Sequence, residues 1–207
     1  MKKYIVEFIG TFFLVLAVCM AGSKAGNMAP LAIGATLMVM IYAGGYVSGG
    51  HYNPAVSLAV FIRGKLAAKE LIIYWIAQIL GGVAAALITL KVFDYAPTAG
   101  EEINIMRSFI AEVIGTFALA YVVLNVATST KTAGNSNYGL AIGFTVTAMA
   151  YTLGPVSRGA FNPAVAVGAS VFGVFEWSTI WLYVVGCLLG GALAGITYTY
   201  IIKPDED

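Results

Sequence analysis

The chain has 207 residues, of which 60% are hydrophobic and only 10% are charged. A soluble domain carries about 25% charged residues, so this composition excludes an ordinary water-exposed globule and indicates a protein surrounded by a lipid bilayer. The formal net charge of +1 creates no field that attracts nucleic acid, and no nucleic-acid partner is expected.

The first half of the chain predicts three membrane-spanning helices and one short helix. A spanning helix needs about 20 apolar residues, and runs near that length occupy 4–21, 31–48 and 71–90. The apolar run 56–62 is too short to span, which is typical of a half-helix that enters the membrane and returns. On the third span we expect Gln78 to form a hydrogen bond between helices.

The second half predicts the same order of elements. Long apolar runs occupy 109–127, 138–156 and 178–202, and a short one occupies 165–175. Because these runs are continuous, they exclude a strand barrel, whose segments would alternate. The predicted fold class is an all-α membrane protein with six transmembrane helices and two re-entrant half-helices.

Small residues on the third and sixth spans allow close helix contact. The sequence leaves open whether that contact lies inside one barrel or between subunits. The residues are Gly81, Gly82, Ala85, Ala86, Gly186, Gly190, Gly191 and Gly195.

The two halves are copies of one another. Residues 7–12 (Glu-Phe-Ile-Gly-Thr-Phe) return as 112–117 (Glu-Val-Ile-Gly-Thr-Phe), and 15 of the 26 residues in 31–56 are identical to those in 140–165. Each copy contains three spans, so the second copy enters the membrane from the opposite side, and an inverted repeat places its working site near the midplane. We expect a first three-span repeat at 1–104 with a half-helix at 53–62. A second repeat at 105–207, with a half-helix at 162–172, is expected to form one domain together with the first.

The most specific motif precedes each short run. It reads Ser-Gly-Gly-His-Tyr-Asn-Pro-Ala-Val at 48–56 and Ser-Arg-Gly-Ala-Phe-Asn-Pro-Ala-Val at 157–165. Asparagine caps a helix through its side-chain oxygen and proline suits the first helical position, so the asparagine NH₂ group stays available as a donor. The predicted pore centre consists of Asn53, Pro54, Ala55, Asn162, Pro163 and Ala164.

The inverted repeat is expected to bring the two helix starts together at mid-membrane. A passing water could accept hydrogen bonds from both Asn53 and Asn162 through its oxygen, which interrupts a proton wire. The positive ends of the two half-helices repel cations. The prediction is a passive pore for water or small uncharged solutes that excludes protons and ions.

These motifs resemble those of the aquaporins and glycerol facilitators, the major intrinsic protein family. The resemblance covers nearly the whole chain and rests on both Asn-Pro-Ala motifs, the Glu-Phe-Ile-Gly-Thr-Phe opening with its second copy, and the Gly-Gly-His-Tyr-Asn-Pro-Ala-Val run. It implies a six-helix barrel with two half-helices, one pore in each subunit and a homotetramer. No cofactor is expected.

The resemblance also implies an outer constriction that sets selectivity. Family members usually carry an arginine three residues after the second motif's asparagine, and this chain has Val165 there. Spacing from the motifs places Ile33, Ala150 and Gly159 in the same constriction. Without the arginine, the constriction is expected to be wider and apolar.

Arg158 is the one basic residue in the second motif and is expected at the pore mouth. Two interpretations stay open. Either it is a solvated residue that holds loop carbonyls in place, or it replaces the missing filter arginine and repels cations from a neighbouring position.

Three further residues are expected to support the pore loops. Glu7 and Glu112 occupy equivalent places in the two copies, and accepting backbone N–H groups of the loops is favoured over relaying protons. His51, the only histidine, is expected to support the first loop rather than to sense pH. No Cys, Asp or Glu cluster accompanies it, so no metal site is predicted.

Basic residues orient the chain. Seven of them fall on one side of the predicted topology and four on the other, which places both termini in the cytoplasm of a multi-pass plasma-membrane protein. The seven are Lys2, Lys3, Arg63, Lys65, Lys69, Lys131 and Lys203, and the four are Lys24, Lys91, Arg107 and Arg158.

Other function classes fit the sequence less well. An enzyme needs a nucleophile, base or metal set, and none is visible. An ion- or proton-coupled secondary transporter of a small solute is the alternative, because it also uses inverted repeats and broken helices. It would normally show several charged groups near the midplane, whereas Glu7 and Glu112 are the only acids within the spans.

Overall fold

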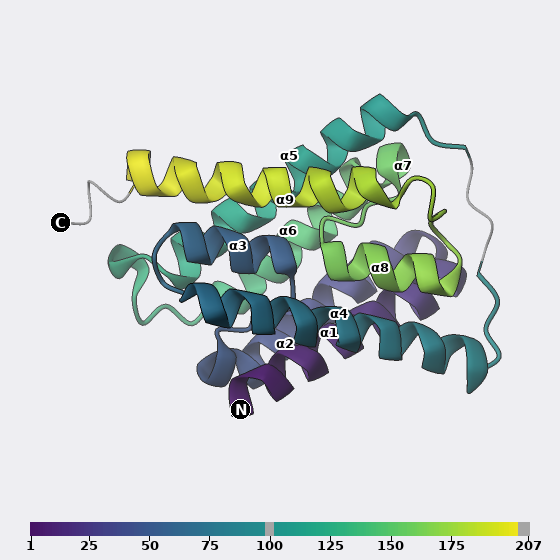
Figure 1. The fold of residues 1–207 in the computed structure, drawn as a ribbon, viewed down its shortest axis with the longest axis horizontal. Coiled ribbons are helices and arrows are strands. Elements are labelled where there is room, and N and C mark those ends of the chain that lie inside the picture. Colours follow the sequence, from purple (N-terminus) through teal and green to yellow (C-terminus); the bar gives the residue numbers. More distant parts are fainter. Residues whose placement is uncertain (98–101, 203–207) are drawn as a thin grey trace.

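The computed structural model describes residues 1–97 and 102–202, and the regular structure within them is helical (Figure 1). Lys203, which contributes to the predicted orientation, lies outside the described residues. The helices are α1 (Lys2–Lys24), α2 (Ala29–Ser48), α3 (Pro54–Ile62), α4 (Ala68–Lys91), α5 (Ile105–Ala127), α6 (Tyr138–Thr152), α7 (Gly154–Ser157), α8 (Pro163–Phe172) and α9 (Ile180–Thr197), with shorter turns η1 (Gly26–Met28), η2 (Thr130–Thr132) and η3 (Tyr198–Ile202).

Helix length agrees with a membrane-spanning bundle. Within the described residues, five helical segments are long and apolar enough to cross a bilayer. They are Lys2–Lys24, Gly26–Ser48, Ala68–Lys91, Ile105–Ala127 and Ile180–Ile202. The remaining predicted span is α6, which has 15 residues and is followed by α7 after Leu153.

The span expected at 138–156 is divided because it contains Pro155. Proline has no N–H to donate to the carbonyl four residues earlier, and α6 accordingly ends at Thr152. The short helix α7 then carries the chain to Arg158, whose left-handed backbone (φ 69°) ends the helix. The chain enters the second motif at Arg158, as it enters the first motif at Gly49 after α2.

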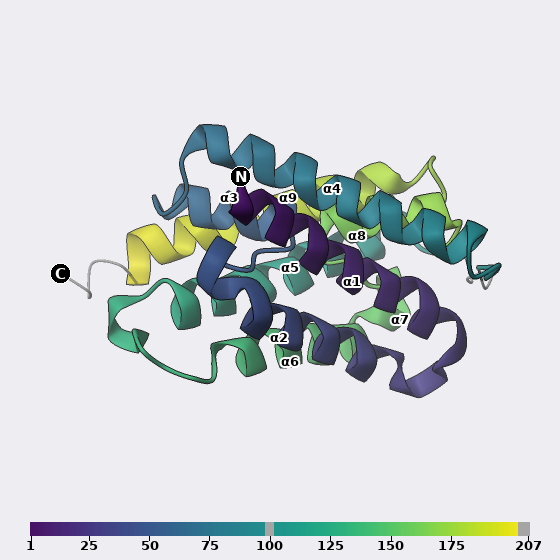
Figure 2. The same cartoon turned by 90° about the horizontal axis from the view of Figure 1, so that it is seen from below.

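The packing of the first half is repeated in the second. α1 contacts α2 and α4, α5 contacts α6 and α9, and α2 packs against α6. Each half-helix packs against the last long helix of the other half, α3 against α9 and α8 against α4. Figures 1 and 2 show α3 and α8 end to end among the long helices, with α1 starting toward the end of the molecule where α9 finishes.

Small residues on α4 and α9 allow each half-helix to pack closely against the long helix of the other half. A side chain at Gly82 would lie 2.8 Å from the carbonyl oxygen of Ala164 on α8, and one at Gly191 would meet the carbonyl oxygen of Ala55 on α3. Gly81 likewise faces the backbone of α1. These close contacts therefore lie inside one barrel, where they seat the half-helices.

Candidate pore

Two asparagines begin the half-helices in the same way. The Asn53 Oδ1 accepts hydrogen bonds from the backbone N–H of Ala55 at 2.8 Å and of Val56 at 3.4 Å. The Asn162 Oδ1 accepts from Ala164 at 2.9 Å and from Val165 at 3.4 Å. The side-chain oxygen of each asparagine thus caps the first helical turn, and its NH₂ group is available to other partners.

Each NH₂ group makes one bond across the molecule. The Asn53 Nδ2 donates to the carbonyl of Phe161 at 2.9 Å, and the Asn162 Nδ2 donates to the carbonyl of Tyr52 at 2.8 Å. An amide nitrogen has two hydrogens, so one N–H remains on each asparagine. The sequence did not predict these reciprocal bonds, which tie the two loops into one unit.

The residue before each asparagine has an unusual backbone. Tyr52 and Phe161 both have φ of 48°, a left-handed conformation that is uncommon in residues other than glycine and is found at functional sites. Their rings lie against Gly10 on α1 and Gly115 on α5, where an added Cβ would overlap the ring. This contact explains why the repeated Glu-x-x-Gly-Thr-Phe opening needs glycine at its fourth position.

Glu7 anchors the first loop from α1. Its Oε1 accepts from the Ser48 hydroxyl at 2.7 Å and the His51 N–H at 3.0 Å. Its Oε2 accepts from the Tyr52 N–H at 2.7 Å and the Gln78 amide at 2.8 Å. The predicted interhelical hydrogen bond of Gln78 is therefore confirmed.

Glu112 anchors the second loop from α5 in an equivalent way. It accepts from the Ser157 hydroxyl at 2.7 Å and from the backbone N–H groups of Ala160 at 2.9 Å and Phe161 at 2.7 Å. Its fourth partner is the Cys187 thiol at 3.3 Å. Both carboxyl groups are 0% exposed, so four donors each, rather than water, satisfy their oxygens.

Trp75 and Cys187 are among the supports of the loops that the sequence did not predict. Trp75 on α4 donates its indole N–H to the carbonyl of Pro54 at 2.9 Å, and a backbone acceptor leaves no signal in a sequence. The sequence did offer a clue to Cys187, because the repeat offset of 109 residues aligns it with Gln78.

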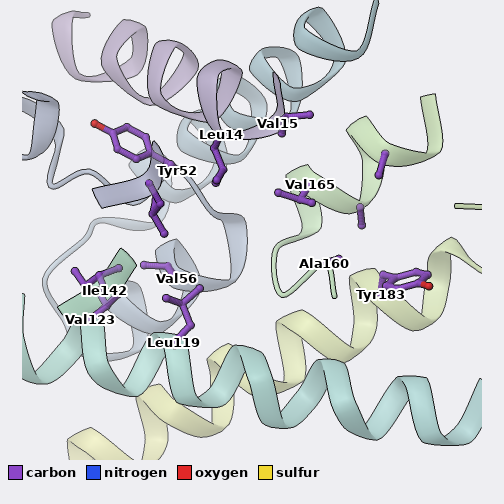
Figure 3. Close-up of a cluster of buried hydrophobic side chains, with 14 of the residues drawn as sticks. Leu14, Val15, Tyr52, Val56, Leu119, Val123, Ile142, Ala160, Val165 and Tyr183 are labelled. Carbon is purple, nitrogen blue, oxygen red and sulfur yellow. The ribbon is translucent and has the colours of Figure 1, made fainter. Parts of the chain in front are cut away.

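A narrow cavity passes the two asparagines. The space open to the centre of a water molecule is about 40 Å³, and one water needs about 10–15 Å³ of such space, so only a few waters fit at once. Among the described residues that line it, polar side chains come from His51, Asn53 and Asn162. The others are Leu14, Val18, Ile33, Leu37, Gly50, Val56, Leu119, Val123, Ile142, Val146, Ala150, Gly159, Ala160, Phe161 and Val165, several of which appear in Figure 3.

Two wider hollows lie near the narrow cavity. Ile33, Ala150 and Gly159 line both the cavity and a hollow of about 480 Å³, which we call the filter-side hollow. Val165, in the first turn of α8, lines the cavity and is 3% exposed. A second hollow, of about 530 Å³, which we call the opposite hollow, is lined by Gly49, next to Gly50 of the narrow cavity, and by the loop after α5.

Arg158 lines the filter-side hollow rather than the narrow cavity. Its Nη1 donates to the carbonyl of Val174 at 2.7 Å, so its side chain is fastened to the loop that follows α8.

The described part of the chain holds no group of three His, Cys, Asp or Glu side chains arranged to bind a metal ion.

Comparison with known proteins gives a consistent family. The model of the major intrinsic protein family matches residues 1–198. A probable TIP-type alpha aquaporin of Phaseolus vulgaris is 35% identical over 224 residues, covering 100% of this chain and 87% of the relative. Aquaporin Z of Brucella melitensis is 32% identical over 229 residues, covering 99% of this chain and 100% of the relative.

A solved structure has the same fold as this chain. The structure of the aquaglyceroporin from Plasmodium falciparum matches with a TM-score of 0.83 at 21% sequence identity, covering 100% of this chain and 98% of that one. The matching proteins are channels rather than enzymes. From the family model and the relatives, this chain belongs to the major intrinsic protein family of passive membrane channels for water and small solutes.

Proposed function

We propose that this protein conducts water and small uncharged solutes while it excludes protons and ions. The observation that carries the proposal is the reciprocal pair Asn53 and Asn162, each of which lines one narrow cavity with one N–H left over. A water whose oxygen accepts both N–H groups turns its hydrogens away along the cavity. Donation back toward the centre is then interrupted, and the positive half-helix ends repel cations.

We propose that selectivity is set by an apolar constriction of Ile33, Ala150, Gly159 and Val165. These positions supply no polar side chain, and valine stands where relatives of this family usually place arginine. Polyols need several hydrogen-bond partners, so the constriction favours water and small solutes with few polar groups over glycerol-like molecules. An arginine there would narrow the passage and donate hydrogen bonds.

Val165→Arg tests the constriction. We expect this variant to lose passage of urea-sized solutes by about tenfold or more relative to water, since a barrier higher by about 1.4 kcal/mol slows passage tenfold. The measurement is stopped-flow light scattering of proteoliposomes with a size series of solutes. Equal ratios of solute to water permeability in the variant and the wild type would contradict the proposed constriction.

Arg158→Ala is the control in the same vesicles. The bond from Arg158 to Val174 supports the loop-holding interpretation, and we propose that role over replacement of the filter arginine. Arg158→Ala is therefore expected to lower thermal stability and to leave cation leak unchanged. A rise in cation leak at low salt would assign Arg158 the electrostatic role instead.

Passive conduction is preferred over ion or proton coupling because of the two buried acids. A coupling carboxylate must be free to exchange its proton or ion during transport. Glu7 and Glu112 each accept four hydrogen bonds from the loops and the packed helices. Their use as anchors leaves them unsuited to that cycle.

We further propose a homotetramer in the plasma membrane, with both termini in the cytoplasm and the filter-side hollow facing outside. The family membership and the excess of basic residues on one side support this arrangement. Native mass spectrometry tests the tetramer, and labelling of cysteines introduced at Gly22 and Gly134 in intact cells tests the orientation. Labelling of Gly134→Cys, but not of Gly22→Cys, from outside would show the opposite orientation.

A further inference from the structure

His51 is the only histidine of the chain, and it lines the cavity beside the two asparagines. Its Nδ1 lies 3.0 Å from the Ser57 hydroxyl oxygen, and its ring packs against that of Tyr74 with a centroid separation of 5.1 Å. A side chain at Gly49 would lie 3.1 Å from Nε2. The ring therefore has Nδ1 beside a buried serine and Nε2 beside Gly49.

Hydrogen bonds connect Glu7 through Gln78 and Ser57 to His51, and the donor and acceptor in each bond can be assigned starting from Glu7. The carboxylate already accepts from Ser48, His51 and Tyr52, so the Gln78 atom at 2.8 Å from it must be the amide nitrogen. A carbonyl oxygen there would repel the carboxylate. The same nitrogen lies 2.9 Å from the Ser57 oxygen and donates its second hydrogen to it.

The hydrogen bond from Gln78 to Ser57 determines which way the serine hydroxyl bonds to the imidazole. Its oxygen accepts from Gln78, so its own hydrogen needs an acceptor, and Ser57 is 0% exposed. Among the described residues, the remaining side-chain neighbour within hydrogen-bond distance is the His51 Nδ1. If Nδ1 carried a hydrogen, in the other tautomer or in the imidazolium, the serine hydrogen would be buried without an acceptor, which costs about 1–3 kcal/mol.

We propose that Gln78 and Ser57 hold His51 neutral, with Nδ1 as an acceptor and the proton on Nε2, so that the pore has a third fixed N–H donor. The titratable groups that face the loop at His51 are Glu7 from α1, Tyr74 from α4 and the adjacent Tyr52. Glu7 acts on the ring through Gln78 and Ser57 rather than by direct contact. Because Nδ1 is engaged with a buried serine, the imidazole has no second face with which to pass on a proton from the cavity.

The internal repeat supports the assignment of these three residues to one unit. At the offset of 109 residues, Ala160 stands in place of His51, Ala166 in place of Ser57 and Cys187 in place of Gln78. The second copy lacks all three members, although it keeps serines and tyrosines equivalent to Ser48 and Tyr74. The chain therefore has the series Gln78, Ser57 and His51 in its first half only.

Nitrogen-15 NMR of the histidine-labelled tetramer tests the assignment directly. With a tag that contains no histidine, the spectrum reports His51 alone. We expect one protonated nitrogen, identified as Nε2 by its coupling to the ring carbons, and no conversion to imidazolium between about pH 5 and 8, the range in which an ordinary histidine changes charge. A proton on Nδ1, or titration within that range, would overturn the proposal.

Ser57→Ala removes the hydroxyl that holds Nδ1, and Ser57→Thr keeps it. In the alanine variant we expect His51 to titrate, and water permeability to change by about twofold or more between pH 5 and 8 as the ring gains charge. The threonine variant and Ser57→Ala/His51→Ala should show the flat profile of the wild type. A flat profile for Ser57→Ala with His51 unprotonated by NMR would contradict the role of Ser57. That the Nε2 hydrogen is donated to molecules in the pore rests on the proposed function, whereas the NMR result does not depend on conduction.

Discussion

Changing both Asn53 and Asn162 to aspartate is expected to raise proton and cation leak through the channel by about tenfold or more, since a barrier lower by about 1.4 kcal/mol gives a tenfold rate. Each carboxylate would still cap its half-helix, but it has no hydrogens to donate. The donors at the centre are lost, and negative charge appears where we propose that the cavity excludes cations. The carboxylate would also face the carbonyl of Phe161 or Tyr52, now without the cross-loop bond.

Asn125→Asp provides a matched control for this experiment. Asn125 donates its amide to the carbonyl of Tyr121 at 2.8 Å on α5, and it does not line the cavity. The control therefore loses one comparable N–H···O bond and gains one negative charge away from the cavity, against two of each in the double variant. Leak is measured in proteoliposomes with an internal pH dye under a potassium diffusion potential. If the double variant leaks no more than Asn125→Asp, the asparagine pair does not form the barrier to protons and cations.

Gly10→Ala is expected to have the largest effect on folding for the smallest change in volume. The added methyl group would overlap the Tyr52 ring, and forced overpacking costs about 1–3 kcal/mol. The ring is held at its far end because the Tyr52 hydroxyl donates to the carbonyl of Met40 at 3.0 Å. The Tyr52 backbone is held as well, because its N–H donates to Glu7 and its carbonyl accepts from Asn162. We therefore expect a lower melting temperature in detergent together with reduced water permeability.

Gly22→Ala on the same helix separates crowding from helix propensity. No atom lies within 4 Å of an added Cβ there, and alanine favours a helix over glycine by about 1 kcal/mol. This variant should be as stable as the wild type or slightly more stable. Gly115→Ala, against the Phe161 ring, should behave like Gly10→Ala. Equal melting temperatures for Gly10→Ala and Gly22→Ala would show that the ring contact does not constrain the loop.

Much of the fold could be predicted because the chain repeats itself. The two Asn-Pro-Ala motifs predicted half-helices, and the structure begins α3 at Pro54 and α8 at Pro163. Spacing from the motifs also selected Ile33, Ala150 and Gly159, which the structure places together at one end of the cavity. Such spacing carries over because helices have a fixed rise per residue.

The bonds that join the two loops could not be predicted in the same way. Their acceptors are the carbonyls of Phe161 and Tyr52, which lie 108 and 110 residues from the donors. Every residue has such a carbonyl, so no side-chain pattern marks them. The loop geometry that aims them comes from the left-handed backbone of Tyr52 and Phe161, for which aromatic residues have no intrinsic preference.

Water and proton permeability of wild-type proteoliposomes, measured on the same preparation, test the central claim most directly. Vesicles receive an osmotic step without any ion gradient, and then a potassium diffusion potential at equal osmolarity. We predict rapid shrinkage in the first case and a proton flux no greater than that of protein-free vesicles in the second. Shrinkage equal to that of protein-free vesicles, or solute movement that requires an ion or proton gradient, would contradict a passive pore for uncharged molecules.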